Sequence, residues 1–491
     1  MFDFEKLKLL KESNKLEVKK AQGGLPRSLW ETYSAFANTD GGTILLGISE
    51  ENEELKIVGV KNLDNLIKDF WSTINSDKVS LNILSENNLI IHDINGLNII
   101  EITIPRAKRY EKPIYLNKNI FGGTYIRTNE GDFKLSQRGV KSLLRDQACE
   151  TMDSLLLEDF LTDDLNKESL RSFRSMHSAH NPTHPFLKLD IDNYLTRIGA
   201  AVFSNKDNQY HPTIAGMLMF GDEWNIVRKF PKYFVEYVEY EDFPISWNER
   251  IISQSGEWSG NLFDFFLIVL NNLYKKYKNK LNIIFERRVD DNLFRKATRE
   301  CLINAIVNSD FYESSSLKIS VFKDKIEFEN PGNIRVGKEQ MIYGGKSDPR
   351  NINIFKMFNL IGLGERAGSG IPRVFEIWNE LGYDIPIIEE TQEPMKTTLK
   401  LPLNIPNKSN NLSDMSDNLS DMSNNPSNIT PMNISDDIIQ LIKNQGEIRS
   451  KDIQIKFNIS SKQANRLLNK LIKQGLIKAI GKNKGRKYIL K

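Results

Sequence analysis

Hydrophobic positions in the first 135 residues follow two periods, one typical of helices and one typical of strands. In residues 28–38, Leu29, Tyr33, Phe36 and Ala37 recur at helical spacing and predict a helix with one buried face. Alternation of hydrophobic and polar residues predicts strands at residues 15–20, 43–48, 89–92, 98–104 and 123–127. We therefore expect residues 1–135 to form a mixed α/β domain.

The following blocks differ in their hydrophobic pattern. Residues 136–285 are expected to form a mostly helical connecting region, with one hydrophobic strand near residues 215–220. Residues 286–403 alternate between helical and strand patterns, which predicts a further α/β domain. Residues 404–432 are rich in Asn, Ser, Asp and Pro and repeat the string Asn-Leu-Ser-Asp-Met-Ser, so they predict a disordered linker.

The last block, residues 433–491, predicts a winged helix-turn-helix, because three short helical patterns precede a hairpin with a Gly-Lys-Asn-Lys-Gly-Arg turn. It holds 14 Lys and Arg against 4 Asp and Glu, a net charge of 14 − 4 = +10, which favours DNA or RNA as a partner. A basic surface on a winged helix that binds protein is the alternative. The third helix and the wing supply the candidate contacts Lys462, Gln463, Arg466, Lys470, Lys482, Lys484 and Arg486.

Composition narrows the class of protein. The 491 residues are 40% hydrophobic and 27% charged, which is typical of globular domains. No run of apolar residues reaches the length of a membrane-spanning helix. Two cysteines and five histidines exclude a disulfide framework and a Cys/His zinc cluster. We expect an α+β multidomain protein of the cytoplasm.

Acidic residues near the N-terminus form the first candidate site. Glu17 lies on the strand predicted at residues 15–20, Glu12 precedes it, and Glu50 follows the strand at residues 43–48. Carboxylates that converge repel one another unless a cation lies between them, and their oxygens suit Mg²⁺ or Mn²⁺. Such an ion activates water for phosphodiester cleavage, with Lys19 close by. The alternative is that these acids are simply solvated at strand ends.

The wider pattern resembles the Schlafen AlbA_2 domain. The strings Glu-Ser-Asn-Lys-Leu-Glu-Val-Lys at residues 12–19 and Ser-Ala-Phe-Ala-Asn-Thr-Asp-Gly-Gly at residues 34–42 carry the resemblance. It implies a nuclease metal site at Glu12 and Glu17. The position of the third acidic ligand corresponds to residue 49 or 50, and of these only Glu50 has a carboxylate, because residue 49 is Ser49. Other members of the family are described only as DNA-binding regulators. In both cases the candidate phosphate contacts include Arg27, Arg109 and Arg127.

A second candidate site lies in residues 286–403. Glu300, Asn304 and Asn308 recur every four residues, so they share one face of a helix among apolar positions. Polar groups beside a core need partners, and hydrogen bonds between helices are one interpretation. The other is a nucleotide site in which Asn304 holds Mg²⁺ against phosphate and Glu300 orients water. Gly368 and Gly370 lie at the start of a predicted helix, where backbone N–H groups can face phosphate.

This block resembles a GHKL-type ATP-binding domain, sometimes described as related to the C-terminus of a DNA helicase. The resemblance is carried by residues 299–305, Asn-Pro-Gly at 330–332, Ser-Asp-Pro-Arg-Asn at 347–351 and Gly-Ser-Gly at 368–370. It implies a GHKL-like α/β sandwich that binds ATP, with Asn330 and Gly332 in the site. The chain departs from the family at residues 308–310, which are Asn-Ser-Asp instead of His-Arg-Asp, and Asn-Pro-Gly replaces the usual Asp-x-Gly-x-Gly.

Two functions agree with these patterns. One is a Mg²⁺- or Mn²⁺-dependent endoribonuclease of the tRNA or rRNA class, regulated by ATP and used in antiviral defence. The other is an ATP-responsive, DNA-binding transcriptional regulator whose first domain binds without cutting. Both predict a nucleic-acid partner, no membrane and a homo-oligomer.

Overall fold

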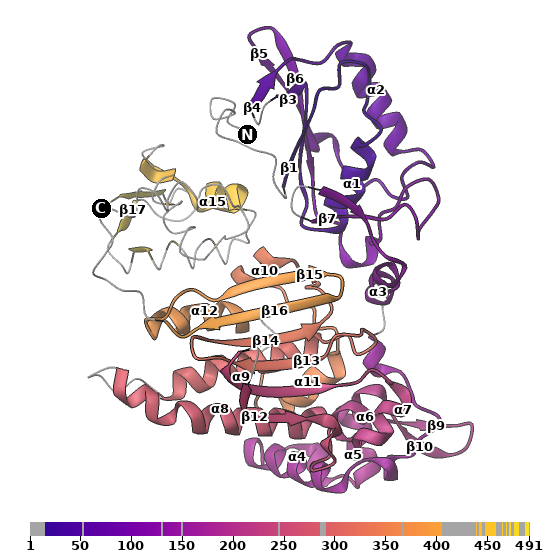
Figure 1. The fold of residues 1–491 in the computed structure, drawn as a ribbon, viewed down its shortest axis with the longest axis vertical. Coiled ribbons are helices and arrows are strands. Elements are labelled where there is room, and N and C mark those ends of the chain that lie inside the picture. The colour runs from indigo at the N-terminus through magenta and orange to yellow at the C-terminus, as the bar shows by residue number, and fades with distance from the viewer. Residues whose placement is uncertain are drawn as a thin grey trace.

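The computed structural model describes three parts of the chain, an N-terminal domain, a central domain and a C-terminal module (Figure 1). Separate hydrophobic clusters lie within the three parts. None of the helices in the described part of the chain is long and apolar enough to cross a membrane. The described residues are 15–51, 54–128, 131–148, 151–243, 246–284, 291–364, 368–404, 438, 441–443, 447–457, 464, 468, 471–472, 476–480 and 487–490.

The N-terminal domain is built on a four-stranded sheet in the order β1-β2-β6-β5. Strands β1 and β2 are parallel, and the other neighbours are antiparallel. Separate hairpins are formed by β3 with β4 and by β7 with β8. The expected helix and strands of this domain are confirmed. The elements are β1 (Leu16–Lys19), α1 (Leu29–Asn38), β2 (Gly42–Leu46), β3 (Ile48–Glu51), β4 (Glu54–Ile57), α2 (Leu63–Ile74), β5 (Leu89–Ile94), β6 (Leu97–Ile104), β7 (Tyr125–Thr128) and β8 (Gly131–Lys134).

The string at residues 34–42 has a structural role. The buried amide of Asn38 donates to the carbonyl oxygens of Ile114 (2.8 Å) and Tyr125 (2.9 Å), and its oxygen accepts from the Ile114 N–H. The Ser34 hydroxyl donates to the same Ile114 carbonyl at 2.7 Å. Gly41 has φ of +74°, and a Cβ there would meet the backbone at the end of β6. This string therefore ties α1 to the sheet and to β7.

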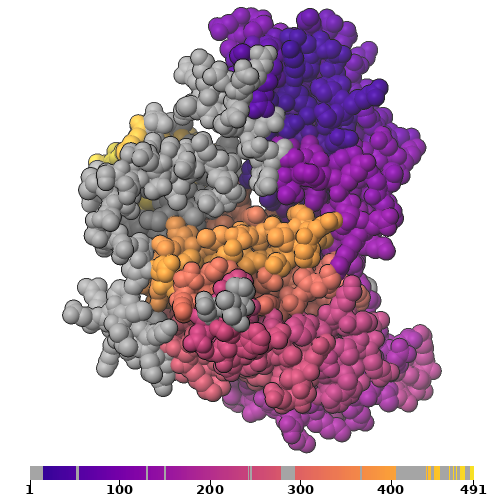
Figure 2. Space-filling view, viewed as in Figure 1, coloured from indigo at the N-terminus to yellow at the C-terminus, as the bar shows by residue number. Residues whose placement is uncertain are grey.

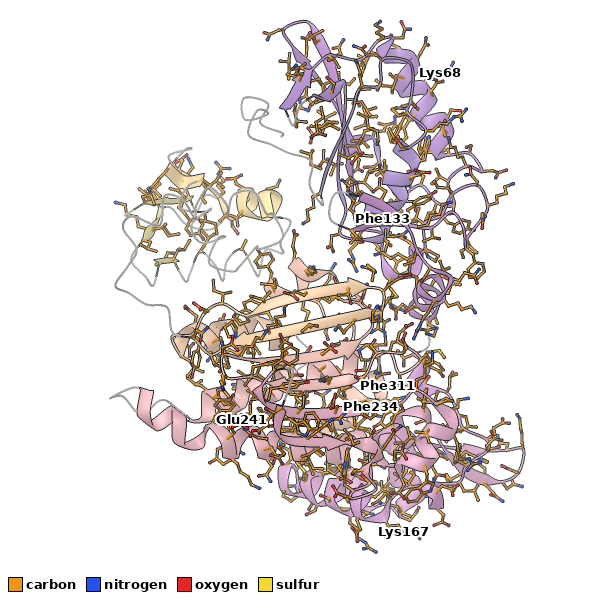
Figure 3. The ribbon with its side chains drawn as sticks, in the orientation of Figure 1. Lys68, Phe133, Lys167, Phe234, Glu241 and Phe311 are labelled. Carbon is orange, nitrogen blue, oxygen red and sulfur yellow. The ribbon has the colours of Figure 1, made fainter. Side chains whose placement is uncertain are left out.

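The central domain has one hydrophobic core, which extends from Leu157 to Leu401 and includes Phe311 (Figure 3). Helix α3 (Gln137–Gln147), the connecting helix, joins this domain to the N-terminal domain. The elements of the central domain are α4 (Lys167–His180), α5 (Ile191–Ile198), β9 (Ala201–Ser204), β10 (Gln209–Pro212), α6 (Ile214–Phe220), α7 (Glu223–Lys229), β11 (Val235–Asp242), β12 (Ser246–Ile252), α8 (Leu262–Ile284), α9 (Asp291–Asn308), β13 (Leu317–Val321), β14 (Lys325–Pro331), α10 (Lys338–Tyr343), α11 (Ile352–Leu360), α12 (Gly370–Glu380), β15 (Ile387–Gln392) and β16 (Met395–Pro402).

A six-stranded mixed sheet organises this domain, in the order β12-β11-β13-β14-β16-β15. Strands β11 and β12 come from the expected connecting region, yet they continue the sheet of the following block through the parallel pair β11–β13. Helix α9 packs against β14 and against α8, α11 and α12. The boundary expected at residue 285 therefore does not divide the sheet or its core.

The strand expected near residues 215–220 is wrong, because these residues form helix α6. The Thr213 side chain accepts a hydrogen bond from the Gly216 N–H and caps the helix. All seven residues of α6 are buried, so the run shows no helical alternation. A short apolar run that is buried on every side gives no period by which helix and strand can be told apart.

The C-terminal module contains α15 (Ser450–Phe457) and a hairpin of β17 (Ile477–Ile480) with β18 (Lys487–Leu490). Ile438, Leu441 and Leu468, which the sequence places on inner helix faces, lie in one small core. Tyr343 of α10 packs against this core, so the module contacts the central domain. All seven residues expected to contact nucleic acid here lie outside the described residues.

The N-terminal and central domains meet along one side of the molecule (Figure 2). The Arg106 guanidinium pairs with Asp40 at 2.8 Å and donates to the Ile334 carbonyl of the central domain at 2.8 Å. On α3, Arg145 pairs with Asp310 at 2.6 Å. These contacts hold the N-terminal domain and the connecting helix α3 against the central domain.

Candidate functional site

Helix α9 directs a polar stripe into a cavity of the central domain. Glu300, Asn304 and Asn308 are half-buried and line this cavity, whereas the residues between them are buried. The space between these residues, counted with the open solvent at its mouth, is about 930 Å³. Of the seven residues expected at the nucleotide site, six line the cavity: Glu300, Asn304, Asn308, Asn330, Gly368 and Gly370.

The amides of this stripe bond along α9 itself. Asn304 Nδ2 donates to Glu300 Oε1 at 2.9 Å and to the Glu300 carbonyl oxygen at 3.0 Å. Asn308 Nδ2 donates to the Asn304 carbonyl oxygen at 2.9 Å. Since Asn304 Nδ2 faces Glu300, its Oδ1 lies across Cγ and points away from that carboxylate. An amide oxygen is a ligand of a type that Mg²⁺ accepts.

The glycines that precede α12 allow the loop to lie against this stripe. A Cβ on Gly370 would overlap Glu300 Oε1, so the first turn of α12 lies directly on that carboxylate. Gly368 has φ of +62° and packs on the Lys346 backbone. The first N–H groups of an α-helix have no partner within the helix, and they attract anions. The start of α12 therefore borders the cavity beside the Glu300 carboxylate.

Of the two residues expected in the site from the turn at the end of β14, Asn330 lines the cavity and Gly332 does not. Asn330 is buried, lines the cavity and donates to the Pro331 carbonyl oxygen at 3.2 Å. Gly332 is outside the lining of the cavity. Its φ is +91°, and a Cβ there would lie 2.5 Å from the Arg350 guanidinium. Gly332 therefore allows Arg350 to pack against the turn.

In the N-terminal domain, Glu17 forms a compact charged cluster on the edge strand β1. Its Oε1 lies 2.7 Å from Lys19 Nζ, and its Oε2 lies 2.9 Å from Arg127 Nη2. Arg127 also pairs with Asp132 at 2.9 Å, and its side chain is only 3% exposed. Lys19 therefore lies next to Glu17 as expected, while Arg127 is held inside the protein as the partner of two carboxylates.

The rest of the expected acidic site is not gathered around Glu17 in the described part of the chain. Glu50 is exposed on the β3–β4 hairpin, and Glu12 lies outside the described residues. Hydrophobic residues of that hairpin pack on the face of the sheet that carries Leu16 and Val18, opposite to the face of Glu17. Among the described residues, no three His, Cys, Asp or Glu side chains lie close enough to hold a metal ion.

Two family models identify domains within the chain. Residues 12–136 match the model described as "Schlafen, AlbA_2", and residues 314–399 match the one described as "Putative ATP-dependent DNA helicase recG C-terminal". The chain carries a Schlafen AlbA_2 domain and a RecG C-terminal-like domain. They indicate a nucleic-acid-related, ATP-associated protein. The second match begins after α9, so the polar stripe of α9 precedes it.

The remaining matches to family models and solved structures assign no further function. Residues 141–236 match a model described as a domain of unknown function, DUF8451, and no curated protein matches the chain. The DIP2311 protein from Corynebacterium diphtheriae is 14% identical, with a TM-score of 0.40, over 97% of this chain and 95% of its own. The N-terminal domain of a "putative ATP-dependent DNA helicase RecG-related protein" from Nitrosomonas europaea is 27% identical, with a TM-score of 0.22, over 26% of this chain and 88% of its own. These TM-scores are too low to establish a shared fold.

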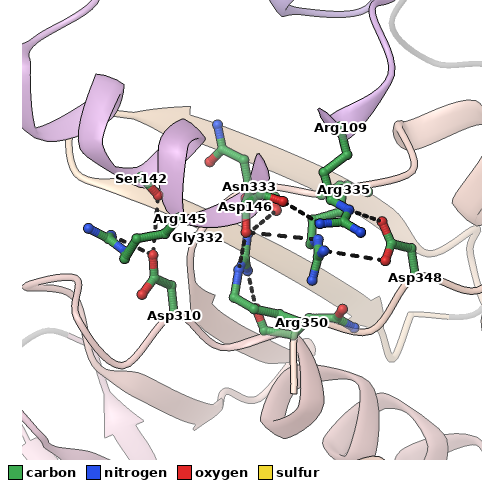
Figure 4. Close-up of polar contacts among 12 residues, drawn as sticks. Arg109, Ser142, Arg145, Asp146, Asp310, Gly332, Asn333, Arg335, Asp348 and Arg350 are labelled. Atoms are coloured by element: carbon green, nitrogen blue, oxygen red, sulfur yellow. Dashed lines mark hydrogen bonds and ion pairs between the residues drawn. The ribbon is translucent and has the colours of Figure 1, made fainter. Parts of the chain in front are cut away.

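Sequence reasoning missed a charged network between the AlbA_2 domain and the cavity (Figure 4). Arg350 pairs with both carboxylate oxygens of Asp146 on α3, at 3.0 and 2.8 Å. Burial alone would raise the pKa of Asp146, but the facing guanidinium groups of Arg350 and Arg335 lower it below its usual value. Arg109 of the AlbA_2 domain, expected to contact phosphate, instead pairs with Asp348 at 3.1 Å. Arg27 is exposed.

Proposed function

We propose that the chain is an ATP-responsive nucleic-acid-binding protein. The observation that carries this proposal is the convergence of Glu300, Asn304 and Gly370 at one cavity of the central domain. The match to a RecG C-terminal model supports an adenine nucleotide as its ligand, and the AlbA_2 domain supports a nucleic-acid partner. The central sheet with α9 and α12 packed beside it then serves as a GHKL-like sandwich.

The cavity residues fit a nucleotide accompanied by Mg²⁺. The Asn304 amide oxygen is a ligand of the type that Mg²⁺ binds, and Mg²⁺ neutralises phosphate charge when it is bound. The N–H groups at the start of α12, at Gly370, would receive a phosphate. Glu300 lies beside both groups and would orient a water molecule, which gives the protein a slow ATPase activity.

Nucleic acid would bind through exposed basic residues of the AlbA_2 domain and through the C-terminal module as a winged helix. Arg27 is exposed on the first of these, and the second carries a net charge of +10 within residues 433–491. Contacts between basic side chains and phosphates release counterions, so binding should weaken steeply as salt is raised.

The proposal is tested by measuring the affinity of the full chain for labelled duplex DNA and for structured RNA, with and without MgATP. We expect at least one of the two to bind and MgATP to change its Kd by about fivefold or more, a usual size for coupled sites. Asn304→Ala should reduce this effect to less than about twofold. The matched control is Asn379→Ala, an exposed asparagine at the other end of α12, which should behave like the wild type. Equal affinities with and without MgATP in the wild type would contradict the proposal.

Endoribonuclease activity is a second candidate, favoured by the contact between Glu17 and Lys19 at the sheet edge. A metal ion there would have to replace Lys19 or Arg127 as the cation that faces Glu17. Such an enzyme would cut tRNA in the presence of Mn²⁺ and would act in antiviral defence, and Glu17→Gln would abolish the cleavage.

The measurement is gel analysis of total tRNA after incubation with Mn²⁺, with and without ATP. Glu86→Gln, an exposed acid of the same domain, is the control and should cut like the wild type. If the wild-type chain leaves the tRNA intact, the nuclease proposal is contradicted, and the proposal of a nucleic-acid-binding protein remains.

A further inference from the structure

The cavity shares part of its wall with the AlbA_2 domain. Asp348 lines the cavity, and its Oδ2 lies 3.1 Å from Arg109 Nε of that domain. Ile334 also lines the cavity, and its carbonyl oxygen accepts a hydrogen bond from Arg106 at 2.8 Å. Neither Arg109 nor Arg106 lines the cavity itself. The AlbA_2 domain thus contacts the far side of residues that face the nucleotide space.

Helix α3 adds a second attachment at the Asn308 end of the cavity. The Asp146 carboxylate holds Arg350 in a two-bond pair, and Arg350 in turn donates to the carbonyl oxygens of Asn308 and, at 3.1 Å, Asn333. Both Asn308 and Asn333 line the cavity. The Arg109 guanidinium donates to the Asp146 carbonyl oxygen at 2.5 Å, which joins the two attachments.

Arg335 lies between these attachments, and its charge is incompletely compensated. Its side chain is 5% exposed and lines the cavity. Its Nη2 lies 3.4 Å from Asp348 Oδ1, and its Nε lies 3.8 Å from Asp146 Oδ1, too far for a hydrogen bond. Nε is buried and has no hydrogen-bond partner among the described residues.

The group as a whole carries an excess positive charge. Three guanidinium groups, Arg109, Arg335 and Arg350, share two carboxylates, Asp146 and Asp348, so 3 − 2 leaves one positive charge. Burial, together with the guanidinium groups of Arg350 and Arg109, lowers the pKa of Arg335 to about 10 although Asp146 opposes this shift. An anion next to Arg335 would relieve this repulsion.

We propose that the negative charge of a nucleotide in the cavity is taken up by Arg335, and that this strengthens the attachment of the AlbA_2 domain. The inference rests on the proposed function, because it needs a nucleotide in this cavity. With the anion on Arg335, Asp348 pairs with Arg109 alone and Asp146 pairs with Arg350 alone. The contact with the AlbA_2 domain and the contact with the connecting helix α3 therefore both become stronger. Coupling of this kind is reciprocal, so a weaker attachment lowers the affinity for nucleotide by the same factor.

The test uses the full chain and Arg109→Met, which alters the AlbA_2 domain without altering the lining of the cavity. Titration calorimetry with MgATP should show affinity about five- to tenfold lower than in the wild type. Hydrogen exchange should show that MgATP slows the amides of α3 in the wild type and much less in Arg109→Met. Arg109→Lys, which keeps the charge, should recover part of both effects. If Arg109 only stabilised the AlbA_2 domain, its replacement would not change the effect of MgATP on hydrogen exchange in α3.

The matched control is Arg138→Met, because Arg138 anchors α3 to Glu313 at 2.8 Å, and Glu313 does not line the cavity. This variant should bind MgATP within about twofold of the wild type. The inference is overturned if the wild type binds MgATP while Arg109→Met binds it equally well, or if α3 exchanges at the same rate with and without MgATP. A wild type that does not bind MgATP at all contradicts the proposed function as well, and calorimetry on the wild type alone distinguishes that result.

Discussion

At the scale of single residues, Arg127 shows how this protein uses buried charge. Its guanidinium lies between Glu17 and Asp132, at 2.9 Å from each, and stacks over the Phe36 ring at 5.1 Å. Two half-buried carboxylates on one cation are stable only while the cation is present. Arg127 therefore fixes the position of Glu17 on β1 from within the AlbA_2 domain.

Arg127→Met should destabilise the AlbA_2 domain by about 3–5 kcal/mol, because Asp132 loses its cation and Glu17 keeps only Lys19. Hydrogen exchange of the α1 and β2 amides measures this loss. The comparison is Lys118→Met, which breaks an exposed pair with Asp77 in the same domain and should cost less than about 1 kcal/mol. Equal losses of stability from the two substitutions would show that the buried position of Arg127 adds nothing to its ion pairs. The double substitution Glu17→Gln with Arg127→Met should recover part of the stability lost in Arg127→Met.

At the scale of elements, the candidate site depends on how closely α12 approaches α9. The approach is set by Gly370, where a side chain would overlap Glu300 Oε1. Alanine is normally the better helix former, by about 1 kcal/mol over glycine. At this position, packing against Glu300 therefore requires glycine, whereas helix propensity alone would favour alanine.

Gly370→Ala should lower the affinity for MgATP by about tenfold or more, or about 1.4 kcal/mol, since it pushes the start of α12 away from Glu300. Circular dichroism should show unchanged helix content. Gly23→Ala, where a Cβ would meet nothing within 4 Å, is the control and should bind like the wild type. Unaltered binding by Gly370→Ala would mean that the α9–α12 contact is not part of the nucleotide site.

Elements with a distinct period could be predicted from the sequence, and contacts between distant elements could not. The spacing of Glu300, Asn304 and Asn308 placed them on one face of α9, and that face does line a cavity. Helix α6 was expected as a strand because its buried run has no period. Arg350 and Asp146 are 204 residues apart in sequence, so no local pattern connects them. Nor did any pattern reveal that β11 and β12 join the sheet of the following block.

At the scale of the whole molecule, the walls of the cavity are where the parts of the chain meet. Ile334 and Asp348 contact the AlbA_2 domain, and α10, which supplies Met341 to the cavity, carries Tyr343 against the C-terminal module. A ligand in the cavity would thus touch residues that the AlbA_2 domain contacts, and it would touch the helix α10 that carries the contact with the C-terminal module. This arrangement explains how one nucleotide could affect two regions that carry the expected nucleic-acid contacts.

The most direct test of this account is titration calorimetry of MgATP into the full-length chain and into Asn304→Ala. The account predicts saturable binding of about one nucleotide per wild-type chain, and affinity at least about tenfold lower when Asn304 is replaced or Mg²⁺ is removed by chelation. It would be contradicted by a wild-type chain that does not bind ATP at millimolar concentration, or by an Asn304→Ala variant that binds MgATP as tightly as the wild type.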